Sequence, residues 1–260
     1  MVKYSILGSG SSANSYIFEN DNGSIIVDNG FSAKELIRRA FEAGHDLDKL
    51  HAILLTHTHS DHMRGVGTAA RKLSVPVSMH EQVSPYNIVK NGKPETFPVK
   101  PGKTYSVGDF SYTAFITSHD APYSISYAIT IQEDSGLKKF VILTDTGEIA
   151  SDVKKLLIDT EVLFLEANYD LQMLLNGPYP PFLKRRIFSK RGHLSNDDAV
   201  DILQKLRDNG NHHLKKIYLC HLSDTNNSPV LVEKACKELI SSGMDITVCS
   251  KGSLYSADLK

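Results

Sequence analysis

Short runs of apolar residues with a two-residue alternation recur along the whole chain and predict about eleven β-strands. Turn residues and stretches with a helical spacing of apolar positions separate these runs. The predicted strands cover residues 3–7, 16–19, 24–27, 52–56, 75–79, 112–117, 127–131, 140–143, 162–166, 217–220 and 246–249. No repeat, low-complexity tract or Pro/Gly linker interrupts the series, so the pattern predicts a single domain over residues 1–260.

Helix signals are fewer than strand signals. Ser32 and Glu35 form a capping-box pattern ahead of a helix that Gly44 ends. Ser195 precedes an acidic first turn, and a Ser-Pro pair at 228–229 opens the last long helix. Four or five helices are too few for a doubly wound parallel sheet with so many strands. The sequence therefore predicts an α+β fold in which two mixed sheets pack on each other with helices outside.

Composition adds limits to this picture. The chain is 41% hydrophobic and 23% charged, as expected of a packed globular core. The longest apolar runs fall far short of the roughly 20 residues that a membrane helix needs. The net charge of −1 creates no global attraction for polyanions, so nucleic-acid binding would need a local basic patch. Three cysteines without metal-ligand spacing, and no visible secretory signal, predict a cytoplasmic protein.

A glycine pattern near the N-terminus matches the dinucleotide-binding fingerprint but lacks its context. Gly8, Gly10 and Ala13 have the GxGxxA spacing, and Asp28 follows about 20 residues later. That fingerprint works only where a helix starts at the glycines and points at the pyrophosphate. Here the glycines lead into a strand, so we expect a tight loop or, less favoured, a loop of backbone N–H groups facing an anion.

Histidines and aspartates gather at the ends of predicted strands. His57, His59, Asp61 and His62 directly follow a buried strand, and imidazole and carboxylate are ligands suited to zinc and similar divalent ions. His57 and His59 share one side of the chain, while Asp61 and His62 come after it turns. Three more strand ends carry such groups: His119, Asp145 and His221. Together these residues predict two metal sites with three or four ligands each.

The run His57-Thr-His59-Ser-Asp61-His62 resembles the HxHxDH motif of the metallo-β-lactamase superfamily, and the later ligands follow in that superfamily's order. The resemblance implies a four-layered αββα sandwich. It assigns His57, His59 and His119 to one metal ion, Asp61, His62 and His221 to the other, and Asp145 to a bridging position. It also implies that Asp28 orients the ligand imidazoles.

Motifs in the second half are similar to those of the bacterial YycJ/WalJ/VicX group within that superfamily. They include 165–174, 183–187, 192–196 and 221–227, and the resemblance extends over nearly the whole chain. It implies a 5′-to-3′ DNA exonuclease linked to DNA repair that attacks a phosphodiester with a hydroxide activated by two metal ions. The alternatives are a small-molecule phosphodiesterase or thioesterase on the same site, or a metal-containing nucleic-acid-binding regulator without turnover.

A basic stretch supports the nuclease hypothesis. Lys184, Arg185, Arg186, Lys190 and Arg191 place five cations in eight residues, which fits a solvated basic face or a phosphate-binding surface equally well. The resemblance to the nuclease group favours phosphate binding. The following loop and helix start carry His193, Ser195 and Asn196, which we expect at the substrate. Within the mechanism, we expect Asp61 to accept the nucleophile's proton and His193 to assist the leaving oxygen. We expect two divalent metal ions per chain, zinc first and manganese or iron as alternatives, because histidine and aspartate ligands accept all three metals.

Overall fold

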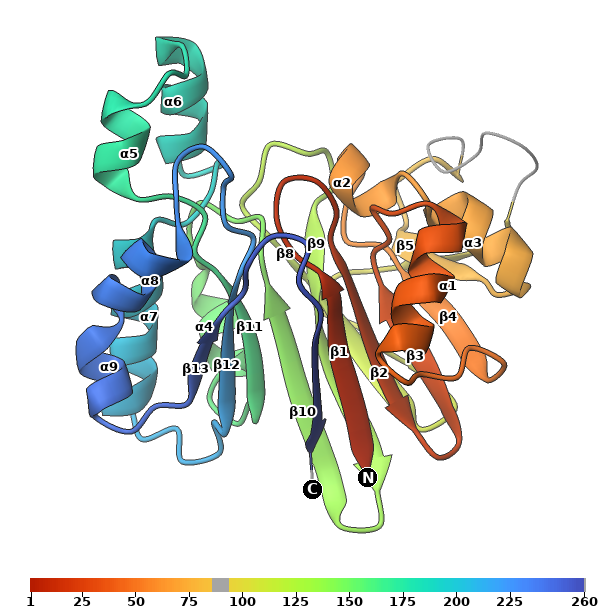
Figure 1. Cartoon of the computed structure of the whole chain (residues 1–260). Coiled ribbons are helices and arrows are strands. Elements are labelled where there is room, and N and C mark those ends of the chain that lie inside the picture. Colours follow the sequence, from red (N-terminus) through yellow and green to blue (C-terminus); the bar gives the residue numbers. More distant parts are fainter. Residues whose placement is uncertain (86–93, 260) are drawn as a thin grey trace. The chain divides into compact units, whose positions relative to one another are not determined.

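The computed structural model describes residues 1–85 and 94–259 (Figure 1). The chain divides into two compact units. Unit 1 takes in Met1–Ile116, Ala121–Lys138 and the segment from Gly252 onward, and unit 2 takes in Thr117–Asp120 and Lys139–Lys251. Among the described residues, no helix is both long and apolar enough to cross a membrane.

Unit 1 contains a mixed seven-stranded sheet in the order β14-β1-β2-β3-β4-β5-β6. Strands β14, β1, β2 and β3 pair antiparallel, and β3 to β6 pair parallel. The strands are β1 (Val2–Gly8), β2 (Ser15–Asn20), β3 (Gly23–Val27), β4 (Leu50–Leu54), β5 (Val77–His80), β6 (Thr96–Val99) and β14 (Tyr255–Leu259). Three helices follow strands of this unit: α1 (Ala33–Glu42), α2 (Ser60–Met63) and α3 (Val66–Leu73).

Both faces of this sheet are covered within unit 1. One face packs against α1 and α3 in an apolar cluster that includes Ile26, Leu36 and Val66, all of them fully buried. The other face meets the antiparallel strands β7 (Thr104–Val107), β8 (Phe110–Ile116) and β9 (Ile125–Glu133). There the hydroxyls of Ser78 and Tyr112 lie 2.9 Å apart, in hydrogen-bond contact. The core of unit 1 therefore lies on both sides of its sheet.

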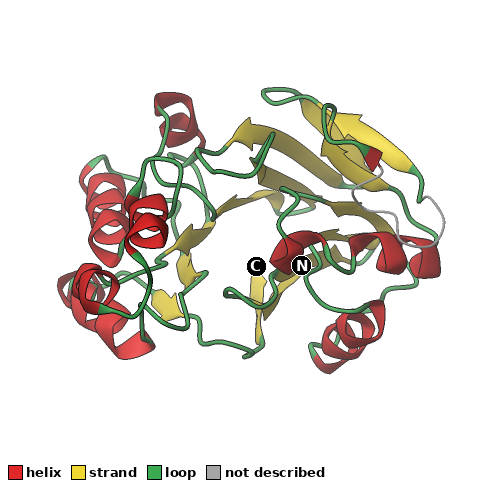
Figure 2. Ribbon diagram, turned by 90° about the horizontal axis from the view of Figure 1, so that it is seen from above, coloured by secondary structure: helices red, strands yellow, loops and turns green. Residues whose placement is uncertain are grey.

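Unit 2 is built on parallel strands with helices around them (Figures 1 and 2). The strands are β10 (Gly136–Leu143, in unit 2 from Lys139), β11 (Val162–Glu166), β12 (Lys216–Cys220) and β13 (Ile246–Val248). The helices are α4 (Ser151–Leu156), α5 (Leu171–Asn176), α6 (Pro181–Phe188), α7 (Asn196–Asp208), α8 (Pro229–Ala235) and α9 (Lys237–Ser241). Because β10, β11 and β12 are parallel, their carboxyl ends meet at one edge. The second sheet has the strand order β13-β12-β11-β10-β9-β8-β7.

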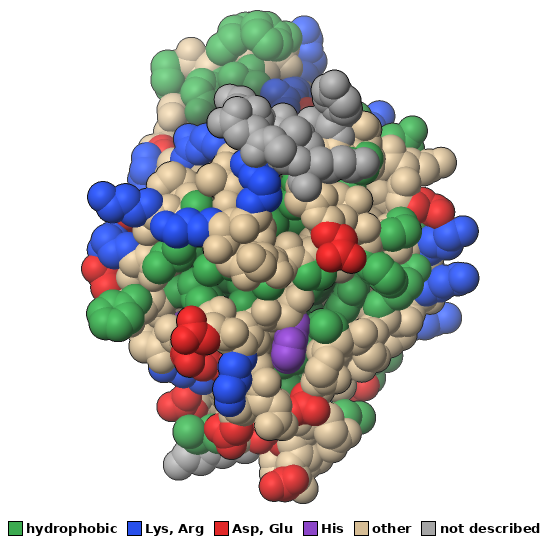
Figure 3. All heavy atoms as spheres, turned by 90° about the vertical axis from the view of Figure 1, so that its right-hand side faces the viewer, with side chains coloured by type: hydrophobic (Ala, Val, Ile, Leu, Met, Phe, Trp, Pro, Cys, Tyr) green, Lys and Arg blue, Asp and Glu red, His purple; other side chains and the backbone are tan. Residues whose placement is uncertain are grey.

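The predicted class of two mixed sheets with helices is confirmed, and the eleven predicted strands are all present. The apolar pattern did not predict three strands, each of which lies at the edge of its sheet: β6, β7 and β14. Edge strands bury little side-chain surface and carry no strong apolar alternation, as the half-exposed pattern of β7 illustrates. The face drawn in Figure 3 mixes acidic and basic side chains, in keeping with the nearly neutral net charge.

Candidate metal centre

The histidine-rich loop of unit 1 is held by close backbone contacts. Strand β4 ends at Leu54, His59 lies at the N-terminus of α2, and Asp61 and His62 lie within that helix. A Cβ atom on Gly30 would come within 2.0 Å of the Asp61 carbonyl oxygen, so only glycine allows this approach. The amide N–H of Asn14 donates to the same oxygen at 2.8 Å. The fold therefore fixes this loop through its backbone.

Asp28 is the buried anchor of the unit 1 ligands. One carboxylate oxygen accepts the Thr56 amide at 2.8 Å, and the other accepts the Thr56 hydroxyl at 2.7 Å and His62 Nδ1 at 2.7 Å. Since the Thr56 hydroxyl donates to Asp28, it accepts from His57 Nδ1, which lies 3.0 Å away. One carboxylate thus fixes two imidazoles with Nδ1 protonated, so that each Nε2 atom carries a lone pair and can act as an acceptor or a metal ligand.

The predicted ligands of unit 1 lie close together. The ring centroid of His57 is 4.8 Å from that of His59 and 4.2 Å from that of His62. The Asn14 side-chain amide nitrogen lies 3.0 Å from His62 Nε2 and 3.2 Å from Asp61 Oδ2. Asn14 comes from the glycine-rich loop between β1 and β2. This loop connects two strands, as expected once the dinucleotide-binding interpretation is rejected, and it contacts the predicted ligands.

In unit 2, Asp145 follows the carboxyl end of β10 and His221 follows that of β12, two parallel strands with β11 between them. Asp145 Oδ1 lies 3.5 Å from His221 Nε2 and 3.7 Å from His119 Nε2. Asp145 and His221 adopt left-handed backbone conformations, with φ of 56° and 57°. Such conformations are costly for residues with a Cβ atom and concentrate at functional sites. The three predicted ligands of this unit therefore converge.

A residue that the sequence analysis did not assign, Glu166, connects the histidines of unit 2. Its Oε1 lies 2.8 Å from His193 Nδ1 and 3.2 Å from His221 Nδ1. Its Oε2 accepts the backbone amides of Leu194 at 3.0 Å and Thr146 at 3.3 Å. Burial opposes ionisation, but the charge and hydrogen bond of His193 and the hydrogen bond of His221 lower the pKa of Glu166 to about 2. An ionised Glu166 accepts from both Nδ1 atoms.

His119 is held by the loop that also carries His193. Its Nδ1 donates to the Gly192 carbonyl oxygen at 3.1 Å, and the Arg191 guanidinium donates to the His119 carbonyl oxygen at 3.3 Å. A Cβ atom on Gly192 would lie 2.1 Å from the Ile187 carbonyl oxygen, so this contact also requires glycine. The Nε2 atom of His119 is thereby turned toward Asp145.

The donor chemistry of both groups fits a divalent metal ion. One ligand atom each from Asp145, Glu166, His193 and His221 lie within 4.8 Å of one another, and those of His57 and His59 are equally close. The Nδ1 atoms of four histidines are engaged by a hydroxyl, a carboxylate or a carbonyl oxygen, which aims their Nε2 atoms at a ligand position: His57, His62, His119 and His221. This is the arrangement in which protein imidazoles bind metals.

The remaining predicted site residues lie around the His193 loop. Ser195 caps α7 in a reciprocal capping box with Asp198, and Asn196 exchanges side-chain hydrogen bonds of 3.0 and 2.8 Å with Asn227. The predicted phosphate-binding cations lie on α6 and are exposed or half-buried: Lys184, Arg185 and Arg186. Contact of these five residues with substrate stays a prediction.

Most of this chain is similar in sequence to known proteins. Residues 24–221 match the family model described as the β-lactamase superfamily domain. The chain belongs to this superfamily. It is 38% identical over 232 residues to Exodeoxyribonuclease WalJ of Streptococcus pneumoniae, covering 86% of this chain and 83% of that protein. It is 32% identical over 242 residues to Exodeoxyribonuclease YycJ of Bacillus anthracis, covering 92% and 89%. The predicted WalJ/YycJ group and the predicted enzyme class, a metal-dependent hydrolase, are confirmed.

Solved structures of the superfamily show the same fold. The metallo-β-lactamase fold protein YhfI from Bacillus subtilis superposes with a TM-score of 0.72 at 17% identity, covering 98% of this chain and 99% of that one. Zn²⁺-bound PqqB from Methylobacterium extorquens gives a TM-score of 0.67 at 15% identity, covering 99% and 100%. The predicted sandwich fold class is therefore confirmed.

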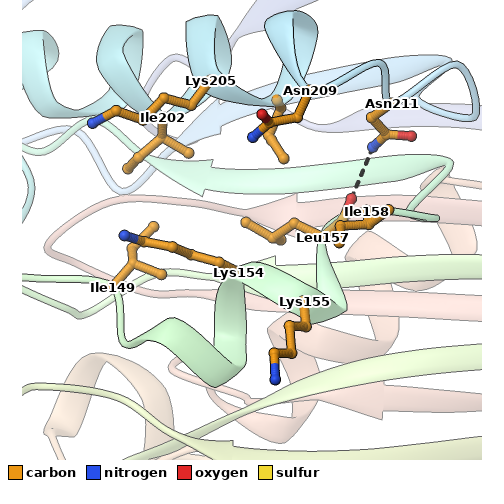
Figure 4. A pocket seen from close by; sticks show the side chains of 10 residues that line it. Ile149, Lys154, Lys155, Leu157, Ile158, Ile202, Lys205, Asn209 and Asn211 are labelled. Atoms are coloured by element: carbon orange, nitrogen blue, oxygen red, sulfur yellow. Dashed lines mark hydrogen bonds between the residues drawn. The ribbon is translucent and has the colours of Figure 1, made fainter.

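A separate pocket of about 350 Å³ lies between α4 and α7 of unit 2 (Figure 4). Leu157, Ile202 and Leu206 contribute to its apolar lining, and the Asn211 amide donates to the Leu157 carbonyl oxygen at 2.8 Å. None of the predicted ligands is among the described residues that line it. This cavity is distinct from the ligand groups.

Proposed function

We propose that this superfamily member is a metal-dependent 5′-to-3′ DNA exonuclease. The observation that carries the proposal is the double anchoring of the ligands: Asp28 in unit 1 and Glu166 in unit 2 each orient two histidines with Nε2 directed outward. The similarity to proteins named exodeoxyribonucleases supports DNA as substrate. We also propose a cytoplasmic role in DNA repair, and the buried free thiols suit a reducing compartment.

We propose that the two groups of ligands hold two divalent ions, zinc first and manganese or iron as alternatives. His57, His59 and His119 would bind one ion and Asp61, His62 and His221 the other, with Asp145 shared between them. Bound ions would lower the pKa of water toward about 7 and neutralise charge on the phosphoryl oxygens. The superfamily's ligand order and the donor chemistry described above support this assignment.

The chain's own residues then move the protons. Asp61, whose carboxylate lies 3.5 Å from Nε2 of the proposed ligand His62, would accept the proton of the attacking water. His193 would donate a proton to the departing oxygen, because its Nδ1 is held by Glu166 and its Nε2 is left to act. The side chain of His193 is 18% exposed, whereas that of Glu166 is fully buried. A partly exposed imidazole on a buried carboxylate suits proton delivery to a substrate.

The basic stretch would bind the phosphate backbone. Arg185 is exposed and has no hydrogen-bond or ion-pair partner among the described residues, so its charge is available to a phosphate. The other two cations are held in place: Arg186 pairs with Asp120, and Lys184 donates to the Leu175 carbonyl oxygen at 2.7 Å. Ser195 and Asn196 come shortly after His193, at the start of α7, and would line the approach to the scissile phosphate.

The test is digestion of end-labelled single- and double-stranded DNA and RNA by purified protein, with and without added Zn²⁺ or Mn²⁺. The proposal expects stepwise shortening of DNA from the 5′ end, abolished by a chelator and by H57A. Cleavage of small phosphodiesters or thioesters without cleavage of any polynucleotide would replace it by a small-molecule hydrolase. Salt-dependent DNA binding with no turnover of any substrate would indicate a regulator.

A further inference from the structure

Helix α6 presents two phenylalanine side chains to solvent. Phe182 is 67% exposed and Phe188 is 62% exposed, although α6 is only eight residues long. At 100° per residue, Phe182, Arg185 and Phe188 follow one another at three-residue steps along one side of the helix. The opposite side, with Leu183 and Ile187, packs into a small apolar cluster with α5. The outward stripe is therefore aromatic, cationic and aromatic in turn.

This stripe lies in the most basic part of the chain. Residues 184–191 contain five cations and no acidic residue. Arg185, in the middle of the stripe, has no ion-pair or hydrogen-bond partner among the residues that the structure describes. Exposed apolar side chains that lie together on one surface, with charged residues around them, mark interaction sites, and here the surrounding positive charge favours an anionic partner. Alternating aromatic and cationic side chains are typical of surfaces that bind single-stranded nucleic acids.

The stripe is coupled to the ligand group of unit 2. The carbonyl oxygen of Ile187, in the last turn of α6, accepts the His193 amide at 3.0 Å. The Gly192 carbonyl oxygen between them accepts from His119 Nδ1. Helix α6 and α5 form a hairpin that stands apart from α7, α8 and α9 of the same unit (Figure 1). A strand lying along the exposed side of α6 would thus be led toward His193.

We propose that Phe182 and Phe188 stack on unpaired bases of the nucleic-acid substrate while Arg185 neutralises the phosphate between them. This inference rests on the proposed nuclease function and specifies its substrate as a polynucleotide with a single-stranded segment. Stacking uses the π-face that every base has, so the contact is independent of base sequence. Phe182 and Phe188 are positioning residues that hold the strand and take no part in the chemical step.

The test compares two probes that carry the same charge. One is a fluorescent, phosphorothioate-linked oligo(dT), and the other is an abasic strand of equal length and linkage. The protein should bind oligo(dT) more tightly. F182L/F188L, which keeps apolar bulk but loses both rings, should weaken oligo(dT) binding by about 5- to 150-fold per stacked base and leave abasic binding unchanged. F182W/F188W, which keeps an aromatic ring at both positions, should bind oligo(dT) about as tightly as the wild type. As a control, F41L removes the ring of Phe41, an 80%-exposed phenylalanine on α1, and should change neither the affinity for oligo(dT) nor that for the abasic strand.

The outcomes separate this inference from the proposed function. Unchanged oligo(dT) affinity of F182L/F188L, in a protein that still cleaves DNA, would overturn base stacking alone. Equal losses on both probes would also overturn it, because a ring that binds bases has no effect on an abasic strand. A wild-type dimer that F182L/F188L converts to monomers would assign the stripe to a second copy of this chain. Absence of binding and cleavage of every polynucleotide by the wild type would overturn the nuclease proposal itself.

Discussion

Replacing Glu166 by glutamine removes one charge while keeping the shape of the side chain, and it tests the anchoring of the unit 2 histidines. The backbone amides of Thr146 and Leu194 both need an acceptor, so the glutamine oxygen takes the place of Oε2. The glutamine NH₂ group then faces Nδ1 of His193 and His221 and can only donate to them. Both rings must therefore carry their proton on Nε2, which blocks the lone pair that His221 needs for a metal ion, and His193 loses the anion that accepts from Nδ1 while Nε2 delivers a proton.

The expected loss follows from these two changes. Loss of a buried partner of a metal-ligating histidine costs roughly 10- to 100-fold in metal affinity or activity. Loss of proton delivery by His193 raises the total to about 10²–10⁴-fold in kcat/KM on DNA. Elemental analysis should also find less bound metal in E166Q than in the wild type. The control is E161Q, because Glu161 is also buried in unit 2 but pairs with Lys215.

Activity and metal content of E166Q within about twofold of the wild type would refute this reasoning, provided that E161Q behaves in the same way. A fall in activity with unchanged metal content would restrict the role of Glu166 to His193. A matching loss of thermal stability in both variants would instead indicate that any buried carboxylate is needed for folding.

Three other predictions concern His193, the basic stretch and a buried cysteine. H193A should retain its metal and slow DNA cleavage by roughly 10²–10⁴-fold, while a nitrophenyl phosphodiester, whose leaving group needs no proton, should be affected much less; equal slowing would contradict proton donation. R185E should weaken DNA binding and reduce its salt dependence but leave the nitrophenyl substrate unaffected, and a loss on both would point to misfolding. Burial raises the pKa of the Cys236 thiol from its usual 9.0 to about 11. The stability that the protonated thiol contributes to the fold is therefore present at neutral pH and is lost as the pH rises from 9 toward 11. Cys236 should resist alkylation at pH 8 until denaturant unfolds the chain, and rapid labelling of the folded protein would contradict this.

The metal ligands could be predicted because each stands directly after an apolar strand. His57 to His62 follow a buried strand without interruption, and Asp145 and His221 follow the parallel strands β10 and β12, which lie on either side of β11. Parallel strands bring their carboxyl ends to one edge, so sequence position alone indicated convergence.

The anchoring residues could not be predicted in the same way. Glu166 also ends a strand, but a single glutamate there is usually solvated, and its two backbone donors come from residues 20 and 28 positions away. The role of Asn14 could not be predicted either, because it is far from His62 in the sequence and the two residues meet only in the folded chain. A search of strand ends for every carboxylate, and not only for histidines and aspartates, would have selected Glu166.

The central claim is that ions held by these residues drive DNA cleavage. Its most direct test is titration of metal-free protein with Zn²⁺ or Mn²⁺ while bound metal per chain and cleavage of end-labelled DNA are measured in the same samples. The account predicts that activity rises as binding approaches two ions per chain, and that D145A, which lacks the shared ligand, neither binds tightly nor cleaves. Full cleavage by chelated protein, or a single bound ion unaffected by D145A, would contradict it.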